Sequence, residues 1–394
     1  MINYNELLNS TVVNTKPSGI RKFFDIAESM QGVISLGVGE PDFKTPWHIR
    51  EAGIKALEKS KTRYTSNWGL IELREEISKK LGKKYGLKYN PNTEVLVTVG
   101  GSEAIEIAVK ALINPGDEVL IPEPSFVCYV PIVQMAGGVP VIINTLEKDE
   151  FRLTAQQLKD AITDKTKLLI FPFPNNPTGA IMERAHLEEI AEVLRDTNIL
   201  VLSDEIYAEL TYGGISHTSI AQIDGMAERT ILISGFSKTY SMTGWRLGYV
   251  CGPEPILTQL VKIHQFCIMS SPTVSHSAAI EALKNGDEDI KSMLAEYDVR
   301  RTYIVNEFRK IGFSCFEPKG AFYAFPCIES TGLSSEEFCE RLLREKKVAA
   351  VPGNAFGESG EGFIRVSYCN SLTNLKTALS RIKEFVDELK GENE

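Results

Sequence analysis

A lysine and an arginine eight residues apart are the residues in this chain that point most directly to chemistry. Lys238 and Arg246 follow the apolar run Thr230–Ser234, which predicts a short buried strand. Lys238 would therefore emerge near the carboxyl end of a strand, the edge of an open α/β sheet where ligands bind. A lysine amine can form a Schiff base with an aldehyde, and an arginine can bind a phosphate. These are the two groups needed to hold pyridoxal phosphate.

Glycines follow another predicted strand, Thr93–Val99, at the point where a helix begins. The sequence there is Gly100-Gly101-Ser102-Glu103. Free backbone amides at the start of a helix, reached through glycines, can bind a phosphate. Two glycines also suit any tight turn, so this segment alone is a weak indication.

Polar side chains follow directly after two further predicted strands. Leu168–Phe173 leads to Asn176, and Ile199–Leu202 leads to Asp204 and Tyr207. Asn176 belongs to a Pro/Asn/Gly turn or serves as a neutral donor at the sheet edge. Asp204 is either a helix N-cap or the partner of a pyridinium nitrogen, and Tyr207 could reach the phenolic oxygen of such a ring. The prediction that this chain binds pyridoxal phosphate depends on all these groups converging at one edge of the sheet.

The elements that must position these groups alternate between strand and helix, which predicts an α/β fold with a mostly parallel, seven-stranded, doubly wound sheet. Leu247–Cys251 follows Arg246 too closely for a helical crossover, so we expect this strand to be antiparallel. The other predicted strands are Thr93–Val99, Glu118–Ile121, Val139–Asn144, Leu168–Phe173, Ile199–Leu202 and Thr230–Ser234.

The pattern changes after about residue 285, and a smaller α+β domain is expected there. It would contain helices at Asp287–Ile311, Ser335–Glu345 and Leu372–Leu389 and strands at Phe313–Phe316, Ala321–Phe325 and Gly362–Ser367. We expect the N-terminal segment to pack with it and the charged tail Lys390–Glu394 to fray. The predicted domains are residues 45–285, which bind the cofactor, and residues 1–44 with 286–394.

Composition excludes several classes of protein. The chain has 394 residues, a net charge of −9 and 43% hydrophobic residues, as expected for a globular protein that binds neither nucleic acid nor an anionic membrane. Its seven cysteines form no CxxC pair, its five histidines lack metal-ligand spacing, and we expect no metal. The N-terminus is no signal peptide, and no apolar run approaches the ~20 residues of a membrane span. A cytoplasmic location is expected.

Several long motifs, in the same order, resemble the class I pyridoxal-phosphate aminotransferases of fold type I over nearly the whole chain. They are Ser35–Phe43, Tyr64–Gly69, Gly100–Ala104, Asn175–Gly179, Ser203–Tyr207, Ser237–Gly248, Gly320–Tyr323, Val351–Phe356 and Phe363–Ser367.

The resemblance implies a role for each candidate residue. Lys238 would form the Schiff base with the cofactor, Asp204 would pair with the pyridinium nitrogen, and Asn176 and Tyr207 would hydrogen-bond the ring oxygen. Phe126 matches the aromatic residue that stacks on the ring. The phosphate would be held by a further set of groups: Arg246, Ser237 and the amides of Gly101, Ser102 and Glu103.

Three more positions carry over from the family. Arg365 matches the residue that binds the substrate α-carboxylate, for which a planar guanidinium is suited because it fixes the carboxylate by two hydrogen bonds. Gly39 matches a position where the backbone approaches the substrate. Tyr64 matches a tyrosine that reaches the phosphate of the neighbouring subunit, which implies a homodimer with shared active sites.

The implied reaction moves an amino group from an L-amino acid to a 2-oxo acid. Lys238 would act as general base and acid, pyridoxamine phosphate would form between the two halves, and the kinetics would be ping-pong. Two alternatives remain open. One is a C–S β-lyase or related elimination enzyme on the same scaffold, and the remoter one is a non-catalytic pyridoxal-phosphate-binding regulator.

The donor is the least determined feature. Some relatives that prefer dicarboxylic substrates carry a lysine where this chain has Ser102, so we expect a neutral or aromatic donor, or broad specificity. Arg21 is a candidate second cation for a distal carboxylate. Glutamate and 2-oxoglutarate are expected as the coupling pair.

Overall fold

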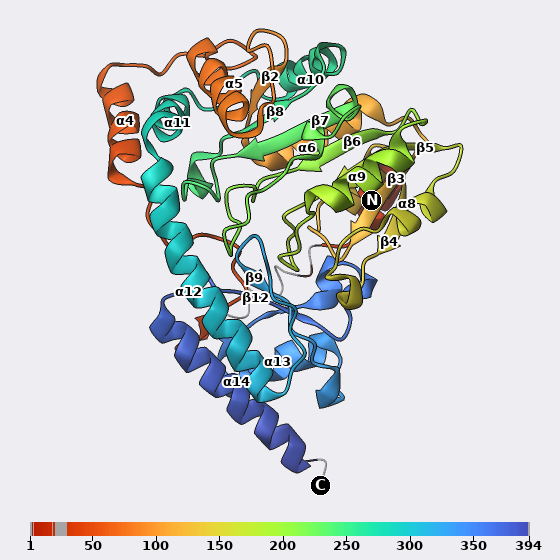
Figure 1. Cartoon of the computed structure of the whole chain (residues 1–394), viewed down its shortest axis with the longest axis vertical. Coiled ribbons are helices and arrows are strands. Elements are labelled where there is room, and N and C mark those ends of the chain that lie inside the picture. Colours follow the sequence, from red (N-terminus) through yellow and green to blue (C-terminus); the bar gives the residue numbers. More distant parts are fainter. Residues whose placement is uncertain (1, 3, 18, 20–29, 393–394) are drawn as a thin grey trace.

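The computed structural model describes residues 2, 4–17, 19 and 30–392. Its centre is a seven-stranded sheet in the order β2-β8-β7-β6-β5-β3-β4 (Figure 1). β8 runs opposite to the other six strands of this sheet, as expected for a strand that follows β7 without a helical crossover. The predicted fold class is therefore confirmed. The strands are β2 (Val95–Thr98), β3 (Glu118–Glu123), β4 (Val139–Asn144), β5 (Thr166–Phe171), β6 (Leu200–Asp204), β7 (Thr230–Gly235) and β8 (Gly248–Cys251).

Helices cover both faces of this sheet because successive strand residues point to opposite sides. In β7, Ile231 and Ile233 pack with α6, α7 and α10 on one face, whereas Leu232 packs with α5 and α11 on the other. In β5, Leu169 and Phe171 join a core with α8 and α9. These helices are α5 (Ile71–Tyr85), α6 (Gly100–Leu112), α7 (Tyr129–Met135), α8 (Ala155–Ala161), α9 (Arg184–Leu194), α10 (Glu254–Cys267) and α11 (Thr273–Asn285).

A smaller α+β region lies below the sheet in Figure 1, connected to it by the 25-residue helix α12 (Asp287–Ile311). Its helices α12, α13 and α14 pack around buried aromatic side chains that include Phe308, Phe338 and Phe385. Two small sheets complete it, β11-β12-β9 and β1-β10. The elements are α13 (Ser335–Lys346), α14 (Leu372–Glu392), β1 (Ile34–Ser35), β9 (Tyr323–Ala324), β10 (Val348–Ala349), β11 (Val351–Pro352) and β12 (Ile364–Ser367).

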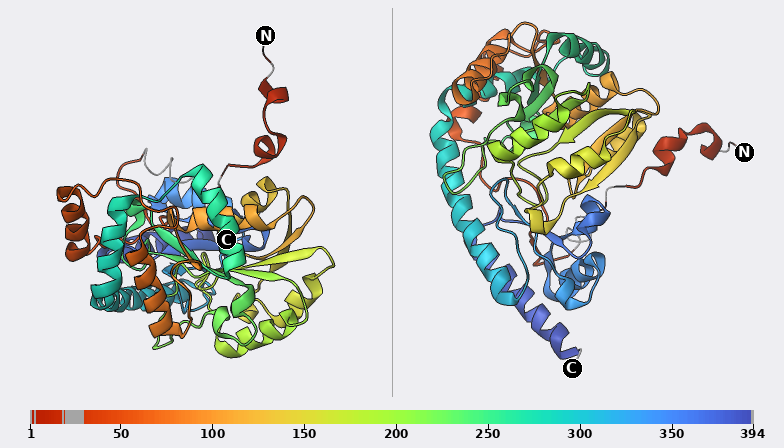
Figure 2. Two further views of the ribbon diagram at one scale, coloured as in Figure 1. Left: turned by 90° about the horizontal axis from the view of Figure 1, so that it is seen from above. Right: turned by 45° about the vertical axis from the view of Figure 1, so that its right-hand side comes forward.

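The N-terminal segment lies in two places. β1 pairs with β10 of the smaller region, in the parallel register Ile34↔Val348. Upstream, the short helix α2 (Ser10–Asn14) contacts α7, and α1 (Tyr4–Leu7) lies farther out, toward the projecting N-terminus (Figure 2). Helix α4 (Trp47–Glu58) follows β1 and packs against α11.

One prediction about the C-terminal region is wrong. Phe313–Phe316 forms no strand: Cys315 makes one isolated bridge, to Pro326, through a hydrogen bond from the Cys327 N–H to the Ser314 carbonyl, while Pro326 accepts from Ile364 of β12 on its other side. Residues 390–392 lie in the last turn of α14, and residues 393–394 lie outside the described residues. Within the described chain, no helix is long and apolar enough to cross a membrane.

A buried carboxyl group at the end of β3 should make stability depend on pH. Glu123 is 8% exposed and packs against Gly357, and burial together with the nearby Glu358 raises the pKa of Glu123 from 4.5 to about 7. The folded chain thus binds a proton more tightly than the unfolded chain. The stabilising contribution of this group is complete below pH 4.5 and is lost as the pH rises through about 7.

Glu123→Gln should therefore raise the free energy of unfolding at about pH 8 by about 1–2 kcal/mol and change it little at about pH 5. Urea unfolding at both pH values measures the difference. The matched control is Glu228→Gln, which removes a carboxylate from an exposed position. An equal effect of the two substitutions at both pH values would contradict the assignment to Glu123.

Candidate active site

The carboxyl ends of the parallel strands border a cavity of about 310 Å³. Residues from α6, the β5–α9 connection, β6, the segment that follows β7, and β12 meet there with the segment around Gly39. Eleven of the residues expected from the sequence line it: Gly39, Gly101, Ser102, Phe126, Asn176, Asp204, Tyr207, Ser237, Lys238, Arg246 and Arg365. Residues separated by more than 300 positions therefore converge at one edge of the sheet.

Lys238 lies just beyond β7 with its amine inside this cavity. Its Nζ donates a 2.6 Å hydrogen bond to the carbonyl oxygen of Gly39, which the N-terminal segment brings across the strand ends. Burial lowers the pKa of Lys238 to about 8, so about a tenth of the amine is neutral at about pH 7, far more than for an ordinary lysine. A neutral amine is the form that attacks an aldehyde and accepts a proton.

Asp204, the last residue of β6, presents its carboxylate to the same cavity. Oδ2 accepts a 2.8 Å hydrogen bond from the Tyr129 hydroxyl, and Oδ1 accepts one of 3.2 Å from the Ile206 backbone N–H. Burial raises the pKa of Asp204 to about 6, and both hydrogen bonds oppose that increase. The carboxylate is thus mostly ionised at neutral pH and can pair with a cationic ring nitrogen.

Tyr129 had no predicted role, although it lies three residues after Phe126, whose ring contacts it edge-on at 6.0 Å. The sequence shows a second aromatic residue in this segment. Only the structure shows that its hydroxyl reaches Asp204, 75 positions away.

The Tyr129→Phe variant tests this contact through the pH dependence of cofactor binding. Loss of the hydrogen bond should raise the pKa of Asp204, so affinity for pyridoxal phosphate should begin to fall at a higher pH. At neutral pH the affinity should drop about tenfold. Titration of the cofactor-free protein between about pH 5 and 8 measures both effects. Tyr212→Phe is the control, because that buried hydroxyl bonds the Ala321 carbonyl and lies outside the cavity; parallel pH curves for wild type and Tyr129→Phe would contradict the prediction.

The start of α6 offers hydrogen-bond donors to a group the size of a phosphate. Gly100 has φ of +77° and lies so close to Arg246 that an added Cβ would stand 2.7 Å from its Nη2. A Cβ on Gly248 of β8 would likewise meet the Gly100 backbone at 2.6 Å. The glycines therefore allow the guanidinium of Arg246 to approach the free amides of this turn.

Glu103 contributes to this turn through its backbone and not its side chain. Its Oε1 lies 2.6 Å from Nδ1 of the fully buried His264 on α10, and its other oxygen accepts from the Val99 N–H. The carboxylate therefore faces away from the cavity and ties the start of α6 to α10.

Arg365, on β12, is held by contacts on every side. Nη1 donates a 2.9 Å hydrogen bond to Asn176 Oδ1, and Nη2 donates to the Gly37 carbonyl. The guanidinium lies between the rings of Tyr323 and Phe356, 4.5 and 4.7 Å from their centroids. Its Nε is buried without a partner in the described chain, which leaves donor capacity for a carboxylate.

Tyr323 is a second residue of this cavity for which the sequence predicted no role, although it ends the motif Gly320–Tyr323. Its hydroxyl lies 2.8 Å from the Tyr207 hydroxyl, and a Cβ on Gly39 would overlap it at 2.3 Å. The absence of a side chain at Gly39 is therefore a steric requirement of this cavity wall.

Two expected residues do not line the cavity. Glu103 lies behind the α6 turn, as described, and Tyr64 is 79% exposed on the surface. Tyr64 therefore does not contribute to the cavity of its own chain. Arg21 lies outside the described residues.

The residues present fit pyridoxal phosphate. A buried amine, a carboxylate for a ring nitrogen, an aromatic ring and a guanidinium beside helix amides surround a volume within the range of small-ligand pockets. Arg365 lies apart from these groups, beside Asn176. Such a site defines an enzyme that acts on amino acids through this cofactor.

Comparison with known proteins agrees with this description. The sequence profile of aminotransferase class I and II matches residues 31–382. The chain is 52% identical to a putative aminotransferase YugH of Bacillus subtilis, with 96% of this chain and 98% of the relative covered. It is 46% identical to an aspartate aminotransferase of Pyrococcus abyssi, with coverages of 95% and 97%. The crystal structure of an aromatic aminotransferase from Pyrococcus horikoshii superposes with a TM-score of 0.90 at 45% identity, covering 93% and 99% of the two chains.

The chain belongs to the class I and II aminotransferases. It is a pyridoxal-phosphate-dependent aminotransferase of fold type I, and its substrates are amino acids and 2-oxo acids.

Proposed function

We propose that this enzyme transfers the amino group of a neutral or aromatic L-amino acid, or of a broad set of them, to a 2-oxo acid by a ping-pong mechanism, with glutamate and 2-oxoglutarate as the coupling pair. The observation that carries the proposal is the convergence of Lys238, Asp204 and Arg365 on one cavity. Bound pyridoxal phosphate supplies the group that takes up the amino nitrogen and the ring that acidifies the substrate Cα–H bond.

Each side chain has one task in this proposal. Lys238, with its pKa near 8, holds the cofactor and then moves the proton from the substrate Cα. Asp204 holds the ring nitrogen protonated, while Asn176 and Tyr207 bind the ring oxygen and Phe126 contacts the ring. Arg246, Ser237 and the α6 turn at Gly101, Ser102 and Glu103 bind the phosphate.

Arg365 and Gly39 position the substrate. Two N–H groups of one rigid guanidinium fix the α-carboxylate and so set the direction of the Cα–H bond relative to Lys238. The rings of Tyr323 and Phe356 hold the guanidinium in place. Gly39 keeps a side chain out of the space that the substrate enters.

The charges around the cavity support a neutral donor. Within the described chain, Lys238, Arg246 and Arg365 are the cationic side chains that line it, and each already has a task. A distal carboxylate would therefore need a cation from elsewhere. Ser102 and Phe126 line the cavity with a small polar and an apolar surface. The printed names of relatives include both aspartate and aromatic aminotransferases, so the donor must be measured.

We further propose a cytoplasmic homodimer in which Tyr64 of each chain reaches the cofactor phosphate of its neighbour. The exposed position of Tyr64 supports this assignment. The proposed domains are residues 45–285 for the cofactor and residues 1–44 with 286–394 for the small domain. The sheet pairing of β1 with β10 is consistent with that division.

A half-reaction screen tests the function directly. The purified, cofactor-loaded enzyme is mixed with single L-amino acids in the absence of any 2-oxo acid while the cofactor spectrum is followed. Stoichiometric conversion to the amine form of the cofactor supports the proposal and ranks the donors. Catalytic release of pyruvate and ammonia would instead show a β-lyase, and a specificity constant for aspartate about tenfold above all neutral donors would overturn the proposed donor class.

A further inference from the structure

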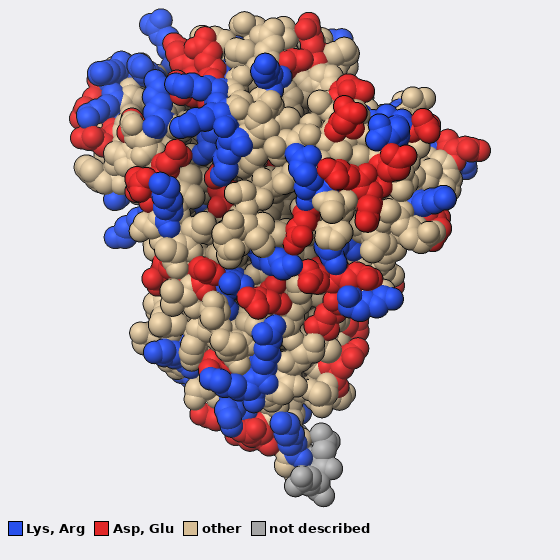
Figure 3. All heavy atoms as spheres, viewed as in Figure 1, with Lys and Arg blue, Asp and Glu red and all other residues tan. Residues whose placement is uncertain are grey.

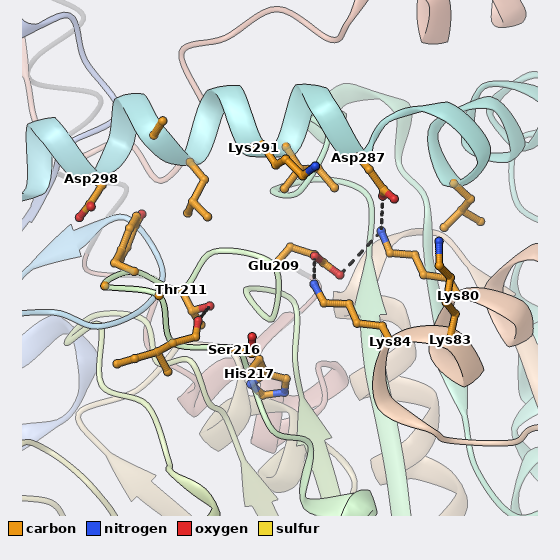
Figure 4. Close-up of a pocket in the computed structure, with 18 of the residues that line it drawn as sticks. Lys80, Lys83, Lys84, Glu209, Thr211, Ser216, His217, Asp287, Lys291 and Asp298 are labelled. Atoms are coloured by element: carbon orange, nitrogen blue, oxygen red, sulfur yellow. Dashed lines mark hydrogen bonds and ion pairs between the residues drawn. The ribbon is translucent and has the colours of Figure 1, made fainter.

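A second cavity, of about 800 Å³, shares no lining residue with the candidate active site. It lies between α5, the segment 209–217 and the first half of α12. Figure 4 shows Lys80, Lys83 and Lys84 projecting from α5, with Glu209 in front of them and Asp287 and Lys291 on the α12 side. We call this cavity the lysine pocket.

The lysine pocket is positively charged although the chain as a whole is not. Six lysines line it, against four carboxylate residues, in a chain with a net charge of −9. Basic side chains gather over the region of α5 and α11 in Figure 3. The lysines are Lys79, Lys80, Lys83, Lys84, Lys284 and Lys291, and the carboxylate residues are Glu76, Glu209, Asp287 and Asp298.

The ion pairs within the pocket leave part of this charge available. Glu209 is paired with Lys84 and lies 3.7 Å from Lys80, which also lies 3.9 Å from Asp287. Glu76 is shared by Lys79 and Lys284, at 3.6 and 3.8 Å. Lys83 has no carboxylate within ion-pair distance among the described residues. Lys291 pairs at 2.6 Å with Glu288, an 83% exposed side chain that does not line the pocket. Cations are therefore present on both sides of the cavity.

The imidazole of His217 forms part of the floor of the pocket. Its side chain is 7% exposed, and its Nε2 lies 2.8 Å from a carboxylate oxygen of Glu205. That carboxylate is therefore already engaged and does not line the pocket. Elsewhere in the lining, a Cβ added to Gly213 or Gly214 would meet nothing within 4 Å, so the space is open.

We propose that the lysine pocket binds a small polyanion, a molecule with two or more phosphate or carboxylate groups. A ligand with two or more anionic groups suits a cavity of this volume whose lysines lie on both α5 and α12. Lysine suits this ligand class because its ammonium is a point charge that needs no fixed acceptor geometry. The proposal goes beyond transamination, since none of these residues belongs to the candidate active site.

Calorimetric titration of the cofactor-loaded enzyme with pyrophosphate and, separately, citrate tests the proposal. At about 20 mM salt, at least one probe should bind one site per chain with Kd below about 1 mM. The Lys83→Glu variant should weaken that binding at least about fivefold. Lys88→Glu is the matched control, because Lys88 is exposed, lies outside the pocket and gives the same change in net charge.

The results distinguish a specific binding site from non-specific electrostatic attraction. Tighter binding of pyrophosphate identifies a phosphate-bearing ligand, and tighter binding of citrate a polycarboxylate. Equal weakening by the two variants would mean non-specific attraction and would overturn the proposal, as would binding that Lys83→Glu leaves unchanged or no binding of either probe. Turnover measured on both variants should equal that of the wild type, which shows that they are folded and keeps this test separate from that of the proposed function.

Discussion

Replacement of Lys238 by alanine is expected to lower turnover by about 10⁴-fold or more and to abolish the visible absorbance of the bound cofactor. The amine of Lys238 is the one nucleophile placed inside the cavity with a pKa lowered far enough to be partly neutral. Its removal takes away both the covalent link to the cofactor and the group that moves the Cα proton. No other lysine lines this cavity in the described chain, so none can substitute.

The fold should survive this substitution, because Lys238 makes one polar contact, to the Gly39 carbonyl. Circular dichroism and urea unfolding check that expectation. Lys238→Arg is the matched variant: it keeps the charge and much of the length but has no nucleophilic amine, so it should be as inactive as Lys238→Ala. Turnover in Lys238→Arg near the wild-type level would show that charge, and not amine chemistry, is what the site needs.

The sheet could be predicted from the sequence because its signals are local. Each buried strand is a short apolar run, and each functional side chain follows one directly, as Asp204 follows β6 and Lys238 follows β7. The carboxyl ends of parallel strands must meet at one edge, so convergence followed from the order of the elements alone. Phe313–Phe316 resembled a strand for the same local reason, but a strand requires a run of paired neighbours, and this segment makes only the isolated bridge between Cys315 and Pro326.

The contacts between side chains could not be predicted, because they join residues far apart in the chain. The Tyr129 hydroxyl reaches Asp204, and the Tyr323 hydroxyl reaches Tyr207, across 75 and 116 positions. The direction of a side chain is equally hidden. Glu103 occupies the expected turn, yet its carboxylate faces His264, 161 positions later. The lysine pocket could not be predicted for the same reason, since its walls on α5 and α12 lie about 200 positions apart in the chain.

Arg365→Lys should lower kcat/KM for amino-acid substrates by about 10²–10³-fold while leaving the spectrum of the bound cofactor unchanged. The variant keeps a positive charge but loses the planar arrangement of N–H groups that Asn176, Tyr323 and Phe356 hold in place. A lysine ammonium can attract a carboxylate without fixing its orientation. The loss should therefore appear in kcat as well as in KM, because the Cα–H bond is no longer aligned with Lys238.

An amine substrate without the α-carboxylate separates this role from a structural one. Wild type and Arg365→Lys should process such an amine at similar, slow rates, because it never used the guanidinium. If the variant lost activity equally toward the amine and the amino acid, Arg365 would act by supporting the cavity wall. The unpartnered Nε and the bond to Asn176 argue for the first outcome, since a wall residue would have no reason to keep buried donor capacity unused.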